Sequence, residues 1–227
     1  MPAAPISILL DLDGTVVDSK PGIAASCRAA LEALRLDAGD LDIGPLIGPP
    51  LEEVMATVLS RFGDDRVAEA VTAYRAHYGE TGYRETAVYP GVPEVLARLA
   101  GEGARLYIAT SKRRVFAERI LDRLGLIDRF AGIHGSEADG RFDHKAELIA
   151  HVLDHHGLEA GRSLMVGDRR HDAEGARANG VHAVGVLWGY GDRAELEAAG
   201  VRDLASAPAD LVSILATFRA GHGPAVS

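Results

Sequence analysis

Residues 6–15 read Ile-Ser-Ile-Leu-Leu-Asp-Leu-Asp-Gly-Thr, and the rest of the chain is best interpreted from this stretch. Apolar side chains on consecutive positions of Ile6–Leu10 predict a strand that is buried on both faces. Ligands of parallel sheets bind at the carboxyl ends of the strands, and Asp11 and Asp13 stand where this strand ends. Alternation along an extended backbone places both carboxylates on one side and Leu12 on the other. The sequence therefore predicts a functional site beside the first strand.

Further apolar runs of strand length repeat along the chain: Arg105–Ala109, Arg129–His134, Ser163–Val166 and Ala183–Leu187. Helical stretches separate them: Arg113–Leu124, His144–His156 and Asp172–Asn179. Gly125, Gly157 and Gly180 follow these helices, where left-handed C-terminal caps are expected. Strands that alternate with helices in this way predict an α/β fold with a parallel sheet.

The alternation breaks after the first strand, because roughly Val16 to Ala87 contains no convincing strand. Helical spacing of apolar residues predicts three helices there: Lys20–Leu36, Leu51–Phe62 and Asp65–Tyr78. Tyr89–Pro93 is interpreted as the return hinge, with a helix opening behind Pro93 over Glu94–Leu99. We expect an α/β core of residues 1–16 and 88–227, an inserted all-helical subdomain of residues 17–87, and a frayed tail over Arg219–Ser227.

Composition narrows the function classes. Lys+Arg 24 against Asp+Glu 33 gives a net charge of −9 without a basic block, which disfavours a nucleic-acid partner. The run Ile6–Leu10 is too short and too soon interrupted for a signal peptide or a membrane span. The single cysteine, Cys27, cannot form an internal disulfide and is interpreted as a packing residue. We therefore expect a soluble cytoplasmic protein, monomeric or homodimeric, with no membrane partner.

A second acidic cluster follows the predicted strand Ser163–Val166. Asp168 and Asp172 stand just beyond it, as Asp11 and Asp13 stand beyond the first strand. Carboxylates converging from neighbouring strand ends are the hard oxygen ligands that suit Mg²⁺. The alternative is structural: Asp13 in a turn with Gly14, and Asp168 as a helix N-cap.

Two further features lie at predicted strand and helix ends. Thr110-Ser111 ends the second strand, where a hydroxyl and the backbone N–H groups of a helix start can hold a phosphate oxygen. Lys145 stands at the start of a helix and offers a cation against the acids and a phosphate. The alternatives are structural: Thr110-Ser111 as a helix N-cap and Lys145 as an ordinary surface lysine.

Together these stretches resemble the four motifs, in order, of the haloacid dehalogenase superfamily: Asp11–Ser19, Thr110–Lys112, Lys145 and Val166–Asp172. Gly48–Leu51, Tyr89–Val92 and Gly167-Asp168-Arg169 with His171-Asp172 resemble its phosphoglycolate phosphatase-like branch. Ser111 in place of the more usual Asn, and Arg113 in place of Pro, depart from the branch pattern. The resemblance implies a three-layer, Rossmann-like parallel-sheet core with a helical cap inserted after the first strand.

The resemblance also implies a mechanism. Asp11 would be the nucleophile that forms an aspartyl-phosphate, and Asp13 the general acid and then the general base. Mg²⁺ would be held by the Asp11 carboxylate, the Asp13 backbone carbonyl and Asp168, with Asp172 close by. The phosphoryl oxygens would be bound by side chains and backbone N–H groups of five residues: Thr110, Lys145, Asp13, Gly14 and Ser111.

Substrate choice would fall to the cap. The loop at Gly48 is expected to face the site, and Arg75, Tyr78 and Arg84 are candidates to meet the leaving group, with a solvated face or hinge as their alternative. We expect hydrolysis of a small, phosphoglycolate-like phosphate ester beneath a cap that opens and closes on hinges at Val16–Ser19 and Ala87–Gly91. The alternatives are a phosphatase for nucleoside monophosphates or sugar phosphates, a phosphomutase, and a non-catalytic binding protein.

Other features carry less weight. His151, His155 and His156 share a predicted helix and superficially offer a transition-metal pair, but they have no acidic or cysteine partner and are interpreted as a polar face. His171 is either a surface residue or a neighbour of the metal. Gly185–Gly191, with Trp188 and Tyr190, is expected to close one wall of the entrance.

Overall fold

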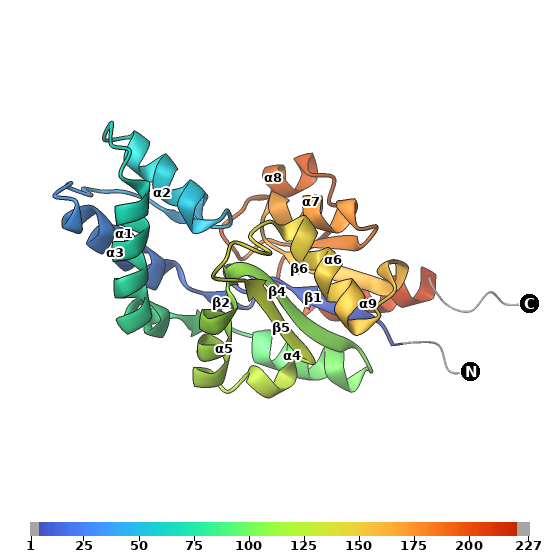
Figure 1. Cartoon of the computed structure of the whole chain (residues 1–227). Helices are drawn as coiled ribbons and strands as arrows, with labels where there is room; N and C mark the ends of the chain where they lie inside the picture. The colour runs from blue at the N-terminus through green and yellow to red at the C-terminus, as the bar shows by residue number, and fades with distance from the viewer. Residues whose placement is uncertain (1–4, 222–227) are drawn as a thin grey trace, which may run out of the picture.

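The computed structural model describes residues 5–221 and contains one six-stranded sheet (Figure 1). Its strand order is β5-β4-β1-β6-β7-β8, and every neighbouring pair is parallel. The strands are β1 (Ser7–Leu10), β4 (Arg105–Arg113), β5 (Gly132–Ser136), β6 (Ser163–Gly167), β7 (His182–Val186) and β8 (Asp203–Ala205). The predicted parallel α/β sheet is therefore confirmed.

Helices cover both faces of this sheet. Along β1, Ile8 and Leu10 belong to the hydrophobic cluster of one face, whereas Leu9 belongs to that of the other. The first face is covered by α4 (Val92–Gly101), α5 (Arg114–Arg123) and α9 (Asp210–Gly221), and the second by α6 (Lys145–His156) and α7 (Arg170–Ala178). A short helix, α8 (Arg193–Ala198), packs beside α7. The three-layer core is confirmed, and the burial of consecutive residues explains the unbroken apolar run.

The central place of β1 creates the site. Leu10 pairs in register with Ile108 of β4 on one side and with Val166 of β6 on the other. The Asp11 N–H continues this ladder by donating to the Val166 carbonyl, at 2.9 Å. Residues that follow β1, β4 and β6 consequently meet at one edge of the sheet.

Three α-helices lie in the inserted segment between β1 and α4: α1 (Lys20–Ala33), α2 (Leu51–Ser60) and α3 (Val67–Glu80). They share a hydrophobic cluster in which Leu31, Met55 and Leu59 are fully buried. Figure 1 shows them standing at one end of the molecule, beyond the carboxyl ends of the strands. The predicted helices are present, with ends shifted by up to three residues.

The expectation of no strand from Val16 to Ala87 is wrong at both ends of that segment. β2 (Val17–Asp18) pairs antiparallel with β3 (Ala87–Val88), and the two form a ribbon where the chain enters and leaves the inserted helices. Strands of two residues are too short to show a period of two, and each one's partner lies far along the chain.

Several element ends also differ from the predictions. β4 continues to Arg113, because Thr110–Lys112 remain extended beside β5 across a register shift. β5 begins only at Gly132, since Ile127–Arg129 form a 3-10 helix. The helix near Pro93 begins one residue before it, at Val92.

The expected tail is partly wrong, because α9 extends through Gly221. The rest of that expectation, residues 222–227, lies outside the described residues. The short elements α8 and β8 were not predicted. Within residues 5–221, no helix is long and apolar enough to cross a membrane.

We propose that residues 17–87 unfold separately from the core, because α1–α3 bury their apolar residues mainly against one another. Trp188, the only tryptophan, reports on the core, where it packs against the main cluster and donates Nε1–H to the Thr15 carbonyl. Leu59→Ala should destabilise the helical segment by about 2–5 kcal/mol. Urea unfolding followed by circular dichroism should then show an early phase that Trp188 fluorescence does not detect.

Leu106→Ala, in the core, is the matched control and should move the fluorescence transition itself. If the fluorescence and circular dichroism midpoints of Leu59→Ala coincide, the inserted helices and the core do not unfold separately.

Candidate active site

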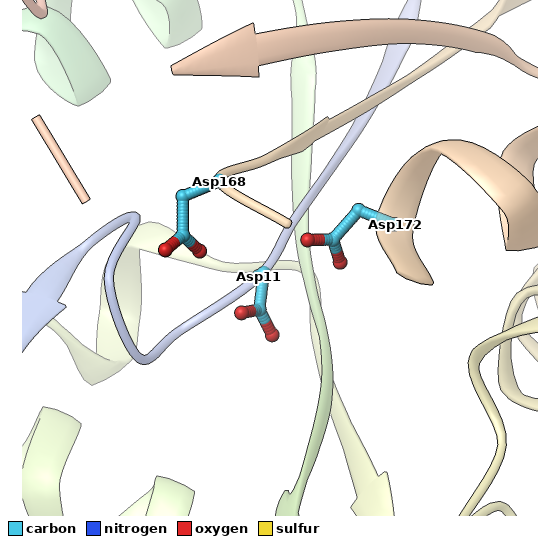
Figure 2. A group of neighbouring side chains, drawn as sticks. All are labelled: Asp11, Asp168 and Asp172. Carbon is cyan, nitrogen blue, oxygen red and sulfur yellow. The ribbon is translucent and has the colours of Figure 1, made fainter. Parts of the chain in front are cut away.

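Three buried carboxylates converge beyond the strands. Asp11 follows β1, Asp168 follows β6, and Asp172 lies in the first turn of α7. One carboxylate oxygen from each lies within 4.8 Å of the others, and Figure 2 shows the three side chains grouped about one space. The structure thus brings together the two acidic clusters that the sequence analysis placed at neighbouring strand ends.

Local backbone geometry makes this convergence possible. Gly14 adopts a φ of +86°, and a Cβ at this position would collide with the Asp168 carboxylate. The Asp168 carboxylate also accepts hydrogen bonds from the Thr15 hydroxyl at 3.3 Å and from the Tyr190 N–H at 2.7 Å. A left-handed glycine therefore lets the loop after β1 close over the end of β6.

The three carboxylates carry more negative charge than the nearby cationic side chains offset. Burial, together with Asp11 and Asp172, raises the pKa of Asp168 to about 8. Burial also raises the pKa of Asp172, to about 6, against the pull of Lys145. The Lys145 ammonium lies 2.8 Å from oxygens of both Asp11 and Asp172. In the described part of the chain, it is the only Lys or Arg side chain paired with any of the three acids.

This donor set fits a divalent cation. Three carboxylates with one ammonium leave an excess of negative charge, and among residues 5–221 the hydrogen bonds to Asp168 come from the neutral Thr15 hydroxyl and Tyr190 N–H. Oxygen ligands of this kind suit Mg²⁺, which also accepts waters and a substrate phosphate as ligands.

Asp13 occupies a separate environment. Its Oδ1 accepts a 2.6 Å hydrogen bond from Ser19, and its Oδ2 lies 2.7 Å from the Lys112 ammonium. The carboxylate therefore does not join the three-acid group, and ligation through the Asp13 carbonyl stays a prediction. Two acids only two residues apart thus have different partners.

Lys112 is a site residue that sequence reasoning missed. It is buried against Asp13 and lies 4.6 Å from the centre of the Tyr78 ring. Burial lowers the pKa of its ammonium, but Asp13 and Tyr78 outweigh this effect and leave that pKa raised. Alternation along β4 gave a usable signal, since Lys112 follows Thr110 by two residues.

The phosphate ligands predicted on the core have mixed outcomes. Thr110 is buried and lines the cavity with Ser111, but both lie within β4, so the expected helix start at this point is wrong. Lys145 donates to Asp11 and to the Ala109 carbonyl, and it forms an ion pair with Asp172, whose Oδ1 accepts no hydrogen bond from the described residues. The contact of Lys145 with phosphate stays a prediction.

A cavity lies between the core and the inserted helices. Asp11, Asp13 and Lys112 line its core side. The facing wall is mainly apolar and comes from the inserted segment: Ile23, Cys27, Ile43, Ile47, Pro49, Pro50, Leu51, Val54, Tyr74 and Tyr78. Phe116 of α5 and the loop after β5 complete it. Asp11, Asp13 and the apolar wall therefore share one space.

Of the residues predicted to contact the substrate, some line the cavity and one does not. Gly48 and Tyr78 line the cavity, as does Arg75, whose guanidinium is 2.7 Å from Glu52. Arg84 is exposed, lies over the Tyr83 ring and does not line the cavity. Of its alternatives, a solvated face or a hinge, the exposure of Arg84 favours the solvated face.

Cys27 packs in the cluster of the inserted helices, as expected, and its side chain also reaches the cavity. Burial raises the pKa of its thiol to about 12, so it is not a nucleophile at neutral pH.

The loop after β7 contacts the segment that the sequence predicts as a hinge, and its place at the entrance stays a prediction. The Tyr190 hydroxyl accepts from the Ser19 N–H at 2.8 Å and donates to Asp18 Oδ1 at 3.1 Å. Neither Trp188 nor Tyr190 lines the cavity. Because the Tyr190 N–H also holds Asp168, one residue connects the acid cluster to the β2 hinge.

Arg169 is a second missed residue. Its Nε lies 2.9 Å from Glu195 of α8, and its other nitrogens donate to the carbonyls of Pro45 and Ile47 in the inserted segment. His171 is half-buried close to Gly48, next to this contact. The fourth motif therefore supplies both an acid cluster and a bridge to the cap loop, and the sequence showed only the first.

Comparisons with known proteins agree with this geometry. The family profile of haloacid dehalogenase-like hydrolases matches residues 8–186. A 5'-nucleotidase of Pseudomonas aeruginosa is 45% identical over 85% of this chain and 87% of its own length. A phosphoglycolate phosphatase of Neisseria gonorrhoeae is 33% identical over 82% of this chain and 81% of its own.

A crystal structure of a predicted phosphatase from Clostridium acetobutylicum superposes with a TM-score of 0.88 at 30% identity. The match covers 95% of this chain and 100% of that one. The whole described architecture, inserted helices included, is therefore shared with a solved structure.

The raised pKa of Asp168 predicts the pH dependence of stability in metal-free protein. Its carboxyl binds a proton more tightly when folded than when unfolded, so this group stabilises the fold at acid pH and less as pH rises toward 8. In EDTA, the free energy of unfolding should fall from pH 5 to pH 8. Asp168→Asn should flatten that slope, because an amide does not ionise.

Urea unfolding across this pH range measures both slopes, and Asp154→Asn, at an exposed position on α6, is the control. If the free energy of unfolding falls with pH equally in Asp168→Asn and in the wild type, Asp168 is not the group whose raised pKa causes the slope.

Proposed function

This chain belongs to the haloacid dehalogenase-like hydrolase family and is a phosphatase, and from that premise we propose a Mg²⁺-dependent phosphomonoesterase that forms an aspartyl-phosphate on Asp11. One observation carries the proposal. Asp11 and Asp13 line the same cavity, yet Asp11 faces the acid cluster whereas Asp13 is held by Ser19 and Lys112. Two neighbouring carboxyls with different environments suit a nucleophile and an acid–base group.

In the first half-reaction, a carboxylate oxygen of Asp11 forms a bond to phosphorus, and the bond from phosphorus to the ester oxygen breaks. The departing oxygen takes the proton of the Asp13 carboxyl and leaves as an alcohol.

In the second half-reaction, the Asp13 carboxylate takes a proton from water as the water oxygen bonds to phosphorus. The bond to Asp11 breaks, phosphate leaves, and both carboxyl groups return to their starting state. Ser19 and Lys112 keep the Asp13 carboxyl at the cavity for both proton transfers.

The Asp11 carboxylate, the Asp13 backbone carbonyl and Asp168 would hold Mg²⁺, with Asp172 close by. When bound, the ion supplies positive charge that offsets the acid cluster and the phosphoryl oxygens. Lys145 offsets part of the negative charge of Asp11 and Asp172, while Thr110 and Ser111 line the cavity where they can contact the phosphoryl group.

The cavity wall favours a nucleoside monophosphate as the substrate over phosphoglycolate. Beyond the core side, the wall is built of aliphatic and aromatic side chains that include Tyr74, Tyr78 and Phe116. A nucleobase buries apolar surface against such a wall. A carboxylate would need a cation on this wall, where Arg75 is paired with Glu52, whereas Arg113 lines the cavity from the core side. The 45% identity to a protein named 5'-nucleotidase supports this choice.

Asp11→Asn should abolish turnover and covalent labelling while the protein remains folded, because an amide oxygen does not serve as the nucleophile. Removal of a nucleophile lowers kcat by about 10³-fold or more. Acid-quenched incubation with ³²P-labelled substrate measures the aspartyl-phosphate, and EDTA with Mg²⁺ added back measures the metal requirement. Asp154→Asn should behave as the wild type. Substantial hydrolysis by a sequence-verified Asp11→Asn protein would remove the covalent mechanism.

The substrate proposal predicts a kcat/KM for a nucleoside 5'-monophosphate that exceeds the value for phosphoglycolate by about tenfold or more. Phe116→Ala should lower kcat/KM for the nucleotide and leave that for phosphoglycolate nearly unchanged. Steady-state kinetics with both substrates decide the point, and Val115→Ala, at an exposed neighbouring position, is the control. Phosphoglycolate hydrolysed as well as or better than the nucleotide would overturn the substrate assignment and leave the Asp11 chemistry standing.

A further inference from the structure

Four histidines gather at the end of α6 opposite Lys145. His134 lies on β5, the edge strand, and its ring centre is 5.4 Å from that of His151, 5.6 Å from His155 and 5.0 Å from His156. The Nε2 atoms of His134 and His156 are 2.8 Å apart. The three helix histidines, interpreted from sequence as a polar face, thus have a partner that only the folded chain brings to them.

The surroundings position these rings. A Cβ at Gly132 would lie 2.7 Å from His156 Nε2 and 2.9 Å from His134 Nε2, so this glycine leaves the space in which the two rings meet. Phe142 stacks on His151, with ring centres 4.3 Å apart, and Tyr107 lies 4.7 Å from His156. Aromatic contacts therefore restrict the imidazoles on both sides of the pair.

The central rings are neutral near pH 7. Burial lowers the pKa of His134 to about 4, and the other three histidines and Arg114 act in the same direction. Burial, His155, His151 and Arg105 lower the pKa of His156. Because both rings are neutral, each has a nitrogen lone pair for a ligand.

We propose that His134 and His156, completed by His151 or His155, bind one divalent transition-metal ion of the class that prefers imidazole, such as Zn²⁺, Ni²⁺ or Cu²⁺. Neutral imidazole nitrogens suit these ions, whereas Mg²⁺ prefers the oxygens of the acid cluster. Tetrahedral bonds of about 2.0–2.1 Å to zinc place two nitrogens about 3.3 Å apart. The two nitrogens lie 2.8 Å apart, so both rings must rotate outward to share one ion. The third ligand requires a further side-chain rotation of His151 or His155, because no three histidine nitrogens of the described residues lie within 4.8 Å of one another.

A bound ion would tie α6 to the sheet edge. α6 begins at Lys145, which contacts Asp11, and β5 ends at Ser136, which lines the cavity. The ion would therefore fix two elements that build one side of the active site while remaining separate from the reacting groups. Its expected effect is a higher unfolding temperature.

The test uses full-length protein without a polyhistidine tag, stripped of metal and kept in millimolar Mg²⁺ to occupy the acid cluster. Calorimetric titration with Zn²⁺ should give one equivalent bound by the wild type. Second-shell changes weaken metal binding by about 10–100-fold, so loss of a ligand in His134→Asn or His156→Asn should weaken it at least that much. His182→Asn, at the exposed pair with Asp203, should bind as the wild type does.

Two further measurements separate this site from the acid cluster and from misfolding. Electron paramagnetic resonance of one equivalent of Cu²⁺ should show coupling to imidazole nitrogens, which His134→Asn removes and Asp168→Asn retains. Circular dichroism and hydrolysis of p-nitrophenyl phosphate should match the wild type in His134→Asn. Unchanged Zn²⁺ affinity in both His134→Asn and His156→Asn, or Zn²⁺ binding lost only in Asp168→Asn, would overturn the proposal.

Discussion

Mutual repulsion of three buried carboxylates is the constraint on which the rest of the molecule depends. Asp11, Asp168 and Asp172 have oxygens within 4.8 Å of one another, and among residues 5–221 only the Lys145 ammonium is paired with any of them. Burial makes this charge costly, and the raised pKa values of Asp168 and Asp172 express that cost. An arrangement that is so unfavourable by itself suits a site completed by a cation and a phosphate ester. The positive charge of the cation offsets the negative charge of the carboxylates and of the phosphate.

The fold maintains this arrangement from several sides. The register of β1 with β4 and β6 fixes where the acids meet, and Gly14 lets the loop after β1 reach Asp168. Tyr190 then joins Asp168 to the β2 hinge, while Arg169 joins the same motif to the cap loop. We therefore propose that movement of the inserted helices alters the acid cluster and so links substrate entry to the chemistry.

Local patterns predicted much of this. The apolar runs gave the parallel sheet, and the positions of Asp11 and Asp168 beyond strand ends gave the site, because both signals lie within short stretches of sequence. The two-residue strands of the hinge, the turning of Asp13 toward Lys112, and the meeting of His134 with the helix histidines were not predictable in the same way. Each depends on residues that become neighbours only in the folded chain.

The most direct test of the central claim is a crystal structure of the protein with Mg²⁺ and beryllium fluoride, which mimics a phosphoryl group bonded to a carboxylate. The account predicts beryllium bonded to an Asp11 oxygen, Mg²⁺ held between Asp11 and Asp168, and the Asp13 carboxyl free beside the fluoride. Beryllium bonded to Asp13, or full occupancy at Asp11 with no cation near Asp168, would contradict it.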